Sequence, residues 1–402
     1  MTTGAAADSL LRSEAVSADR DPDGSQDRAT EPLRIGLLGL GTVGRAVAAA
    51  LLDERWRERV RRRGGPALRL VAVGVRDPGR SRALELPASV EASDELEGLV
   101  ARPDLDVVVE LLGGIDPAER LVRSALALGR GVVTANKALL SARGASLEQL
   151  SRRTGAPLRF EAAVGGGIPI LTPLVRDLAA SHIGSLSGIV NGTTNHILTA
   201  MTRDGTDYAE ALAEAQRLGY AEADPTADVE GLDAAAKLAI LARLAFGVWL
   251  DPARIPRGSS AGGDAAPGII GISSRAIAAA GEQGRVMKLL VRAERRRDGT
   301  IDAWVAPVAV PRASPIGATD GVTNIVEIDA DPLGRVWFRG PGAGGPATSS
   351  AVLADLLALG RGEGATWGPL PEAPEAPLTT TGWVGPWLDV ATPSGRSRYP
   401  LL

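Results

Sequence analysis

The sequence contains no cysteine among its 402 residues. Disulfides, thiolate metal sites and cysteine nucleophiles are therefore excluded. Aromatic residues make up only 3%, so aliphatic and small side chains must fill the core. The 44 basic and 48 acidic side chains nearly balance, so the basic excess typical of nucleic-acid binding is missing. No apolar run approaches the roughly 18–20 residues that cross a bilayer, and the N-terminus lacks a secretory-signal pattern.

These absences predict a soluble, cytoplasmic protein, and at roughly 100–200 residues per domain the length predicts two to three domains. Between residues 33 and 153, short apolar runs alternate with helical patterns. The runs lie at 33–38, 68–75, 106–112 and 131–134, and the helical patterns at 43–60, 117–128 and 139–153. Such alternation predicts an α/β fold with a parallel sheet and right-handed crossovers. A long helical block follows at 208–249.

Three segments lack a regular pattern. Residues 1–31 are rich in Ala, Ser, Asp and Arg, which predicts a disordered tail. The composition of residues 256–268 indicates a flexible loop. Residues 361–402 are rich in Pro and Gly but also contain Trp367, Trp383 and Trp387. Because tryptophan is unusual in a pure linker, we expect this last segment to pack on a surface.

A glycine-rich turn joins the first predicted strand to the first predicted helix. Gly39, Gly41 and Gly44 form the pattern Gly-x-Gly-x-x-Gly, with Thr42 and Val43 before the last glycine. The first glycine permits a tight turn, the second lets the backbone approach a pyrophosphate, and the third lets helix and strand pack closely. The helix N-terminus then points at the phosphates. In this context the pattern predicts a dinucleotide site, with a purely structural turn as the alternative.

The end of the second predicted strand bears on the choice of cofactor. A carboxylate there would bind the ribose 2′-hydroxyl of NAD, whereas an arginine suits the 2′-phosphate of NADP. Arg76 comes first and Asp77 follows it. This order favours NADP and leaves NAD possible. An ordinary exposed loop arginine is the alternative interpretation of Arg76.

Ionisable residues are concentrated between Gly219 and Lys237. Asp233 and Lys237 are four positions apart, so they share one face of a predicted helix. Their spacing alone favours a surface ion pair worth roughly a few tenths of a kcal/mol. The surrounding sequence changes that interpretation.

Five segments resemble, in order along the chain, signature segments of homoserine dehydrogenases. They are VVTANKALL (132–140), FEAAVGGGIPI (160–170), GIVNGTTNHIL (188–198), LGYAEADPTADVEGLDAAAKLAIL (218–241) and GPGAG (340–344). The family interconverts homoserine and aspartate semialdehyde with NAD(P), a branch step toward threonine and methionine. The resemblance therefore implies this activity, these small-molecule substrates and an NAD(P) cofactor.

The resemblance also implies roles for individual residues. Lys237 matches the lysine that donates a proton to the carbonyl oxygen during reduction, and Asp233 and Lys137 belong to the same catalytic group. Glu222, Asp228 and Asp233 are expected to hold the substrate. Lys137 is expected to lie between substrate and nicotinamide and to position both. This chemistry suits lysine, because hydride transfer to an aldehyde develops an alkoxide that a nearby cationic acid stabilises.

Further positions follow from the same resemblance. Gly219 and Gly342 are expected at the cofactor. A monovalent cation, usually sodium in the family, is expected on backbone carbonyls of four residues, which are Glu161, Val164, Gly166 and Ile168. His196 stands where the family usually has tyrosine, so we do not expect a catalytic histidine.

The implied architecture is a discontinuous Rossmann domain, residues 32–159 plus 316–360, with an inserted α/β domain at 160–315 for substrate binding and dimerisation. We expect a homodimer. The C-terminal segment 361–402 is too short for the amino-acid-sensing module that many relatives carry, so we expect none.

Two alternatives were weighed. The phosphorylating aspartate-semialdehyde dehydrogenase also has a Rossmann domain, but it needs a cysteine to form a thioester, and this chain has none. A non-catalytic NADP-binding sensor on the same fold is the other alternative. A sensor has no need of the full set formed by Lys137, Glu222, Asp233 and Lys237.

Overall fold

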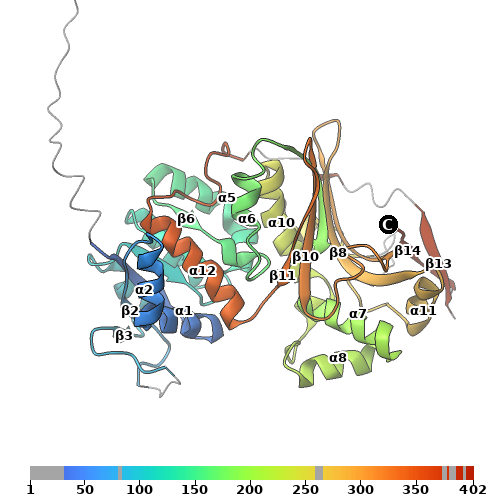
Figure 1. Ribbon diagram of the computed structural model, residues 1–402, viewed down its shortest axis with the longest axis horizontal. Coiled ribbons are helices and arrows are strands. Elements are labelled where there is room, and N and C mark those ends of the chain that lie inside the picture. The colour runs from blue at the N-terminus through green and yellow to red at the C-terminus, as the bar shows by residue number, and fades with distance from the viewer. Residues whose placement is uncertain (1–30, 80–83, 259–265, 374–377, 380–385, 393–394) are drawn as a thin grey trace, which may run out of the picture.

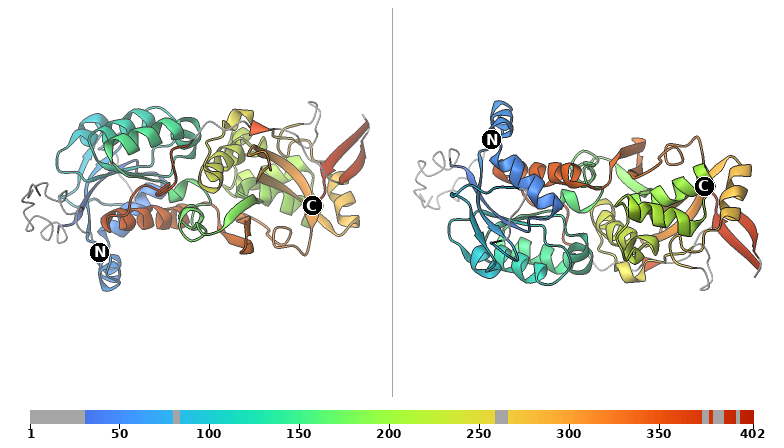
Figure 2. Two further views of the ribbon diagram at one scale, coloured as in Figure 1. Left: turned by 90° about the horizontal axis from the view of Figure 1, so that it is seen from above. Right: turned by 90° about the horizontal axis from the view of Figure 1, so that it is seen from below.

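The computed structural model describes residues 31–79, 84–258, 266–373, 378–379, 386–392 and 395–402. The predicted tail at 1–31 lies outside the described residues except for its last position, as do Trp383 and most of the predicted loop at 256–268. The chain forms two lobes side by side along its longest axis (Figure 1; Figure 2). Each lobe is built around one six-stranded sheet.

The first lobe contains a wholly parallel sheet with the strand order β3-β2-β1-β4-β5-β6. Its strands are β1 (Leu33–Leu38), β2 (Leu68–Gly74), β3 (Glu91–Ser93), β4 (Val107–Glu110), β5 (Gly131–Thr134) and β6 (Leu158–Arg159). Its crossover helices are α1 (Thr42–Leu52), α2 (Glu54–Arg62), α3 (Leu96–Ala101), α4 (Ala118–Ala127) and α5 (Lys137–Thr154). This order reverses between β1 and β4, which is the arrangement of dinucleotide-binding sheets. The α/β prediction is confirmed.

Both faces of this sheet are covered, which explains why its strands are continuous apolar runs. On one face, α3, α4 and α5 bury residues such as Leu121 and Leu139 against Val108 and Val132. On the other face, α1 packs with the later helix α12 (Gly345–Gly360) around residues that include Leu37.

The predicted helix at 43–60 is wrong in one respect, because it is interrupted at Asp53. This residue has extended backbone angles, and its carboxylate accepts a hydrogen bond from Arg55 N at 2.9 Å. Asp53 therefore ends α1 and caps α2. Aspartate competes well for such a capping position, and an apolar pattern does not reveal the interruption.

The second lobe has a mostly antiparallel sheet with the order β11-β10-β7-β8-β9-β12. Its strands are β7 (His182–Ile189), β8 (Arg285–Arg295), β9 (Ile301–Pro311), β10 (Thr323–Asp331), β11 (Gly334–Pro341) and β12 (Leu378–Thr379). Its helices, with one short turn, are α7 (Gly192–Asp204), α8 (Tyr208–Arg217), α9 (Thr226–Val229), α10 (Leu232–Phe246), η3 (Pro252–Arg254) and α11 (Ser274–Glu282). The predicted helical block at 208–249 is thus three helices. Between the lobes lie η2 (Glu161–Ala163) and α6 (Leu171–Val175).

The chain returns to the first lobe later than predicted. The sequence placed this return at about residue 316, but β10 and β11 belong to the second sheet. After β11, the chain packs on the first lobe again at α12, which begins at Gly345 and lies against α1. The pattern of a strand shows that it is buried but not which sheet it joins, so this boundary was beyond the sequence.

The C-terminal segment packs on both lobes. Trp367 is buried and its ring lies 5.4 Å from that of Phe160. Further on, β13 (Trp387–Thr392) and β14 (Gly395–Pro400) form a hairpin, and Leu402 N donates to Ala309 O at 3.2 Å. The expectation of a packed tail is confirmed for these described stretches.

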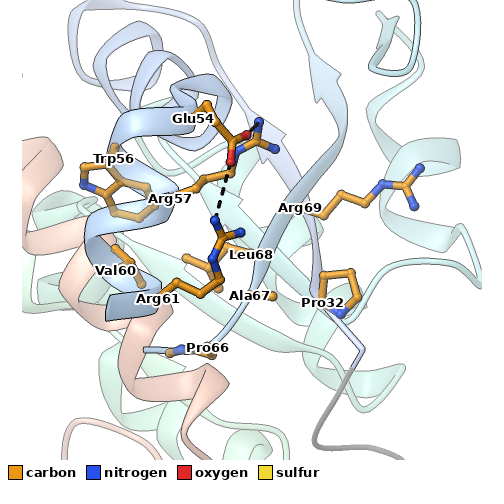
Figure 3. Close-up of a pocket in the computed structure, with 10 residues that line it drawn as sticks. All are labelled: Pro32, Glu54, Trp56, Arg57, Val60, Arg61, Pro66, Ala67, Leu68 and Arg69. Carbon is orange, nitrogen blue, oxygen red and sulfur yellow. Dashed lines mark hydrogen bonds and ion pairs between the residues drawn. The ribbon is translucent and has the colours of Figure 1, made fainter. Parts of the chain in front are cut away.

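A hollow beside α2 lies away from the nucleotide turn. It is lined by Trp56 and Val60, by Pro32 just before β1, and by the first residues of β2, as Figure 3 shows. On the α2 side of it, Glu54 pairs along the helix with Arg57 and Arg61. The nucleotide turn follows the carboxyl end of β1, whereas this hollow lies beside the amino end of β2, so the two are at opposite ends of the parallel strands.

None of the helices in the described part of the chain combines the length and apolar character that a membrane span requires.

We expect Trp367→Ala to lower the free energy of unfolding by about 3–5 kcal/mol, because it removes a large buried ring. The control is Leu128→Ala, since Leu128 is 52% exposed at the C-terminal end of α4 and its loss should cost about 0.5 kcal/mol or less. Urea unfolding followed by circular dichroism measures both. Equal effects of the two substitutions would show that the C-terminal segment adds nothing to the core.

Candidate active site

The glycine turn leaves the first turn of α1 open to a ligand. Gly39 has φ 97°, and its N–H donates to Gly74 O at 2.9 Å, which ties the turn to β2. A Cβ at Gly44 would overlap the Gly39 carbonyl oxygen, so helix and strand pack closely there. A Cβ at Gly41 would meet nothing within 4 Å, and no side chain caps the helix at this residue. The free N–H groups behind the exposed Thr42 therefore suit a phosphate.

A buried carboxylate, which the sequence analysis did not single out, organises the neighbouring strand ends. Glu110 at the end of β4 is fully buried and accepts hydrogen bonds from Thr134 Oγ1 at 2.6 Å and from Leu112 N at 2.8 Å. Asn136 N donates to Thr134 Oγ1 at 3.0 Å, and the Asn136 side chain caps α5. This network determines where α5 begins, and hence where Lys137 stands. Its signal in the sequence was an acidic residue ending a run of valines.

Asp233 lies between two lysines from different helices. Its Oδ2 is 2.7 Å from Lys237 Nζ, and its Oδ1 is 3.2 Å from Lys137 Nζ. The side chains of Asp233 and Lys237 are only 6% and 11% exposed, whereas that of Lys137 is 44% exposed. The surface-pair interpretation of Asp233 and Lys237 is therefore wrong. Burial alone would raise the pKa of Asp233, but the two ammonium groups and the hydrogen bonds lower it to about 2.

Asn191 joins this group to Asp228 and was missed by the sequence analysis. Its Nδ2 donates to Asp233 Oδ2 at 2.8 Å and to Asp228 Oδ1 at 2.7 Å. Its Oδ1 accepts from Thr194 N at 2.9 Å and so caps α7. Lys237 Nζ also donates to Val190 O at 2.7 Å, the carbonyl just before Asn191. The signal was an N-cap asparagine directly before Gly-Thr-Thr.

Two further predicted residues, Gly219 and Glu222, lie between α8 and α9. Glu222 is exposed, and its carboxylate makes no hydrogen bond or ion pair with the described residues. Gly219 is left-handed, with φ 75°, where α8 ends. Its conformation accounts for a glycine there, and α8 belongs to the second lobe, whereas the nucleotide turn belongs to the first (Figure 1).

The segment with the four predicted cation ligands lies between the lobes. Glu161, Val164, Gly166 and Ile168 are all buried. The carboxylate of Glu161 is occupied, since it accepts hydrogen bonds from Ile170 N and Leu171 N at the start of α6. Among the described residues, no hydrogen bond is donated to the backbone carbonyl oxygens of the four residues.

The GPGAG segment connects this loop to the nucleotide turn. A Cβ at Gly166 would lie 2.5 Å from Gly342 O, and one at Gly345 would lie 3.2 Å from Thr42 O. A Cβ at Gly342 would overlap the buried side chain of Asn324. Gly342 therefore lies where the loop of residues 161–168 and the start of α12 meet.

The remaining predicted residues lie outside this cluster. Arg76 is exposed just after β2 and makes no hydrogen bond or ion pair with the described residues. Asp77 Oδ1 accepts from Gly79 N at 2.9 Å. The His196 ring packs at a tilt against that of Tyr220, with ring centroids 4.8 Å apart, and burial lowers the pKa of His196, which favours the neutral ring.

Comparison with known proteins places the chain in a family. The family profile described as "Homoserine dehydrogenase, NAD binding domain" matches residues 39–161, and that described as "Homoserine dehydrogenase" matches residues 169–357. The homoserine dehydrogenase of a Synechocystis strain is 43% identical over 328 residues, which cover 81% of this chain and 72% of that protein. The chain belongs to the homoserine dehydrogenase family. The resemblance inferred from its five segments is confirmed.

Solved structures of homoserine dehydrogenases share the fold. The crystal structure of the enzyme from Thiobacillus denitrificans has a TM-score of 0.80 and 38% identity, covering 87% of this chain and 80% of that one. A hyperthermophilic archaeal homoserine dehydrogenase in complex with NADPH has a TM-score of 0.63 and 25% identity, covering 82% and 97%. This chain is accordingly an NAD(P)-dependent oxidoreductase acting on a CH–OH group.

We expect Asn191→Asp to lower kcat/KM for homoserine roughly tenfold or more, because a charge-assisted hydrogen bond is worth about 1.5–3 kcal/mol. Aspartate keeps the α7 cap but replaces the bridging donor with a third carboxylate. Asn191→Ser also keeps a cap, adds no charge, and should lose less. The measurement is steady-state kinetics with thermal unfolding as the folding control. Wild-type kinetics in both variants would show that the hydrogen bonds from Asn191 to Asp233 and Asp228 do not contribute to catalysis.

Proposed function

We propose that this homoserine dehydrogenase reduces L-aspartate 4-semialdehyde to L-homoserine, and runs the reverse reaction, with Lys237 as general acid and base and with NADPH preferred over NADH. The observation that carries this assignment is the contact of the buried Asp233–Lys237 pair with Lys137, which comes from the other lobe. The product stands at the branch toward threonine and methionine.

The geometry of Lys237 leaves one donor for the substrate. An ammonium group has three N–H bonds. Hydrogen bonds to Asp233 Oδ2 and Val190 O use two of them, which leaves the third for a substrate oxygen. A reduced nicotinamide, with its pyrophosphate held by the glycine turn, would supply the hydride for the aldehyde carbon. As the C–H bond forms, Lys237 gives its proton to the developing alkoxide and is reprotonated from solvent.

Asp233 keeps this acid in place. Because its pKa is lowered to about 2, it remains ionised throughout the physiological range and pairs with both lysines. The more exposed Lys137 can then turn toward the substrate carboxylate while it stays near Asp233. The free carboxylate of Glu222 suits the substrate ammonium group, and Asp228 supplies a second acceptor beside Asn191.

The cofactor assignment follows from the edge of the parallel sheet. The open start of α1 suits the pyrophosphate, with Gly39, Gly41, Thr42, Val43 and Gly44 around it. Arg76 is free of partners among the described residues and stands after the adjacent strand β2, where an arginine suits a 2′-phosphate. Asp77 instead accepts from its own turn. The NADPH complex of the archaeal relative supports the same preference.

A monovalent cation, sodium in our proposal, belongs on the loop of residues 161–168. Support comes from its four buried carbonyl oxygens, which receive no hydrogen bond from the described residues. Buried carbonyl groups without partners are rare, so a cation would satisfy them. We also propose a homodimer, since β11 is the edge of its sheet and exposes Trp337.

We expect Lys237→Met to reduce kcat for the semialdehyde by about 10²–10⁴-fold, because the proton donor is lost. NADPH binding should remain near the wild-type value, since the nucleotide turn is untouched, and fluorescence titration of NADPH is therefore the folding control. Stopped-flow absorbance measures the loss of NADPH. Near-normal turnover in this variant would remove Lys237 from the chemistry, and a wild type that oxidises neither NADPH nor NADH would end the enzyme assignment.

We expect Arg76→Ala to raise KM for NADPH about tenfold or more while leaving KM for NADH unchanged, because it removes one charged contact to the 2′-phosphate. Arg69→Ala is the matched control, since Arg69 is exposed at the start of β2, the end opposite to that which Arg76 follows (Figure 3). Both constants come from initial rates at saturating semialdehyde. A similar rise for both cofactors would exclude Arg76 from phosphate recognition.

A further inference from the structure

The two helices that carry the catalytic group run in the same direction and are joined at both ends. At their N-terminal ends, Lys137 of α5 meets Asp233 of α10 at 3.2 Å. About three turns further along each helix, roughly 15 Å away, Glu148 of α5 meets Arg243 of α10. The second contact lies far from the substrate, so it has no direct part in the chemistry.

Glu148 forms the centre of this distant contact. Its carboxylate accepts from Arg243 Nε at 2.8 Å and from Arg243 Nη2 at 2.6 Å, and also from Trp249 Nε1 at 2.8 Å. Glu148 is 1% exposed and Arg243 is fully buried. A two-pronged contact between arginine and carboxylate fixes direction as well as distance.

A close approach at Gly144 adds a steric constraint. A Cβ at this residue would overlap the indole ring of Trp249, which follows the end of α10. Lys137, Gly144 and Glu148 are spaced seven and four positions apart, so they lie on one face of α5. The face that presents Lys137 to Asp233 is thus the face that is held against the end of α10.

The C-terminal segment covers the outside of the contact. Arg243 Nη2 donates to Pro371 O at 2.7 Å, and Arg152 Nη2 donates to Leu370 O at 2.7 Å while also binding Glu148. The buried ring of Trp367 anchors this segment a few residues earlier.

We propose that Gly144, Glu148, Arg243 and Trp249, here called the helix clasp, are positioning residues that set the approach of Lys137 to Asp233. Because both helices are rigid, a change in their spacing at the clasp changes the spacing of the two lysines at the other end. This inference rests on the proposed function of Lys137, Asp233 and Lys237. It adds that the rate of reduction depends on a contact outside the substrate site.

The test is a double-mutant cycle on the close approach. Gly144→Ala inserts a methyl group against the indole, and we expect kcat for the semialdehyde to fall about tenfold or more, since displacement of reacting groups by about 1 Å can cost 10²-fold. KM for NADPH should stay unchanged, because the glycine turn is not involved. Trp249→Phe removes the outer ring, and in the double variant it should restore kcat to the value of Trp249→Phe alone.

The controls separate positioning from folding and from the function itself. Gly98→Ala is the matched helix substitution, since the nearest atom to its Cβ would be 3.8 Å away, and it should leave kcat at the wild-type value. If Gly144→Ala does not fold, Arg243→Lys replaces it. Lysine keeps the charge but not the two-pronged contact, and should lower kcat at constant KM for NADPH. A lower melting temperature with wild-type kcat, in an active wild type, overturns the clasp; an inactive wild type overturns the function instead.

Discussion

The structure of the site depends on one carboxylate held between two ammonium groups. The ionised form of Asp233 is strongly favoured, because Lys237 and Lys137 lie against its two oxygens and Asn191 donates to one of them. Removing one member of such a buried group leaves an unpaired charge, which is strongly destabilising. The charge of Lys237 and the placement of Lys137 are therefore coupled through Asp233.

Two helix N-termini meet at this carboxylate, and two others meet beside the nucleotide turn. Asp233 is in the first turn of α10, Lys137 opens α5, and the uncapped start of α1 lies beside the start of α12. Each N-terminus carries a partial positive charge that favours nearby anions. The arrangement suits a ligand set of phosphates and a carboxylate.

Local rules and global packing contributed differently to what could be predicted. The glycine turn could be predicted because each glycine answers a local steric requirement, and Lys237 was found because its segment resembles a family signature. The break at Asp53 could not be predicted, since the free energies of a continuous helix and of a helix interrupted by a capping carboxylate differ only slightly. Asn191 and Glu110 were missed because their partners are 42 and 24 positions away.

The sequence by itself determined the parallel α/β sheet, the nucleotide turn and the family, because these depend on hydrophobic period, glycine sterics and residue order. Only the tertiary structure decided that Asp233 and Lys237 are buried, that β10 and β11 join the second sheet, and that Glu148 of α5 is bonded to Arg243 near the end of α10. The physical reason is that burial and long-range pairing are properties of the assembled chain. An Asp–Lys pair four positions apart contributes little free energy on a solvated helix, whereas the same pair buried between two packed lobes requires matched charges.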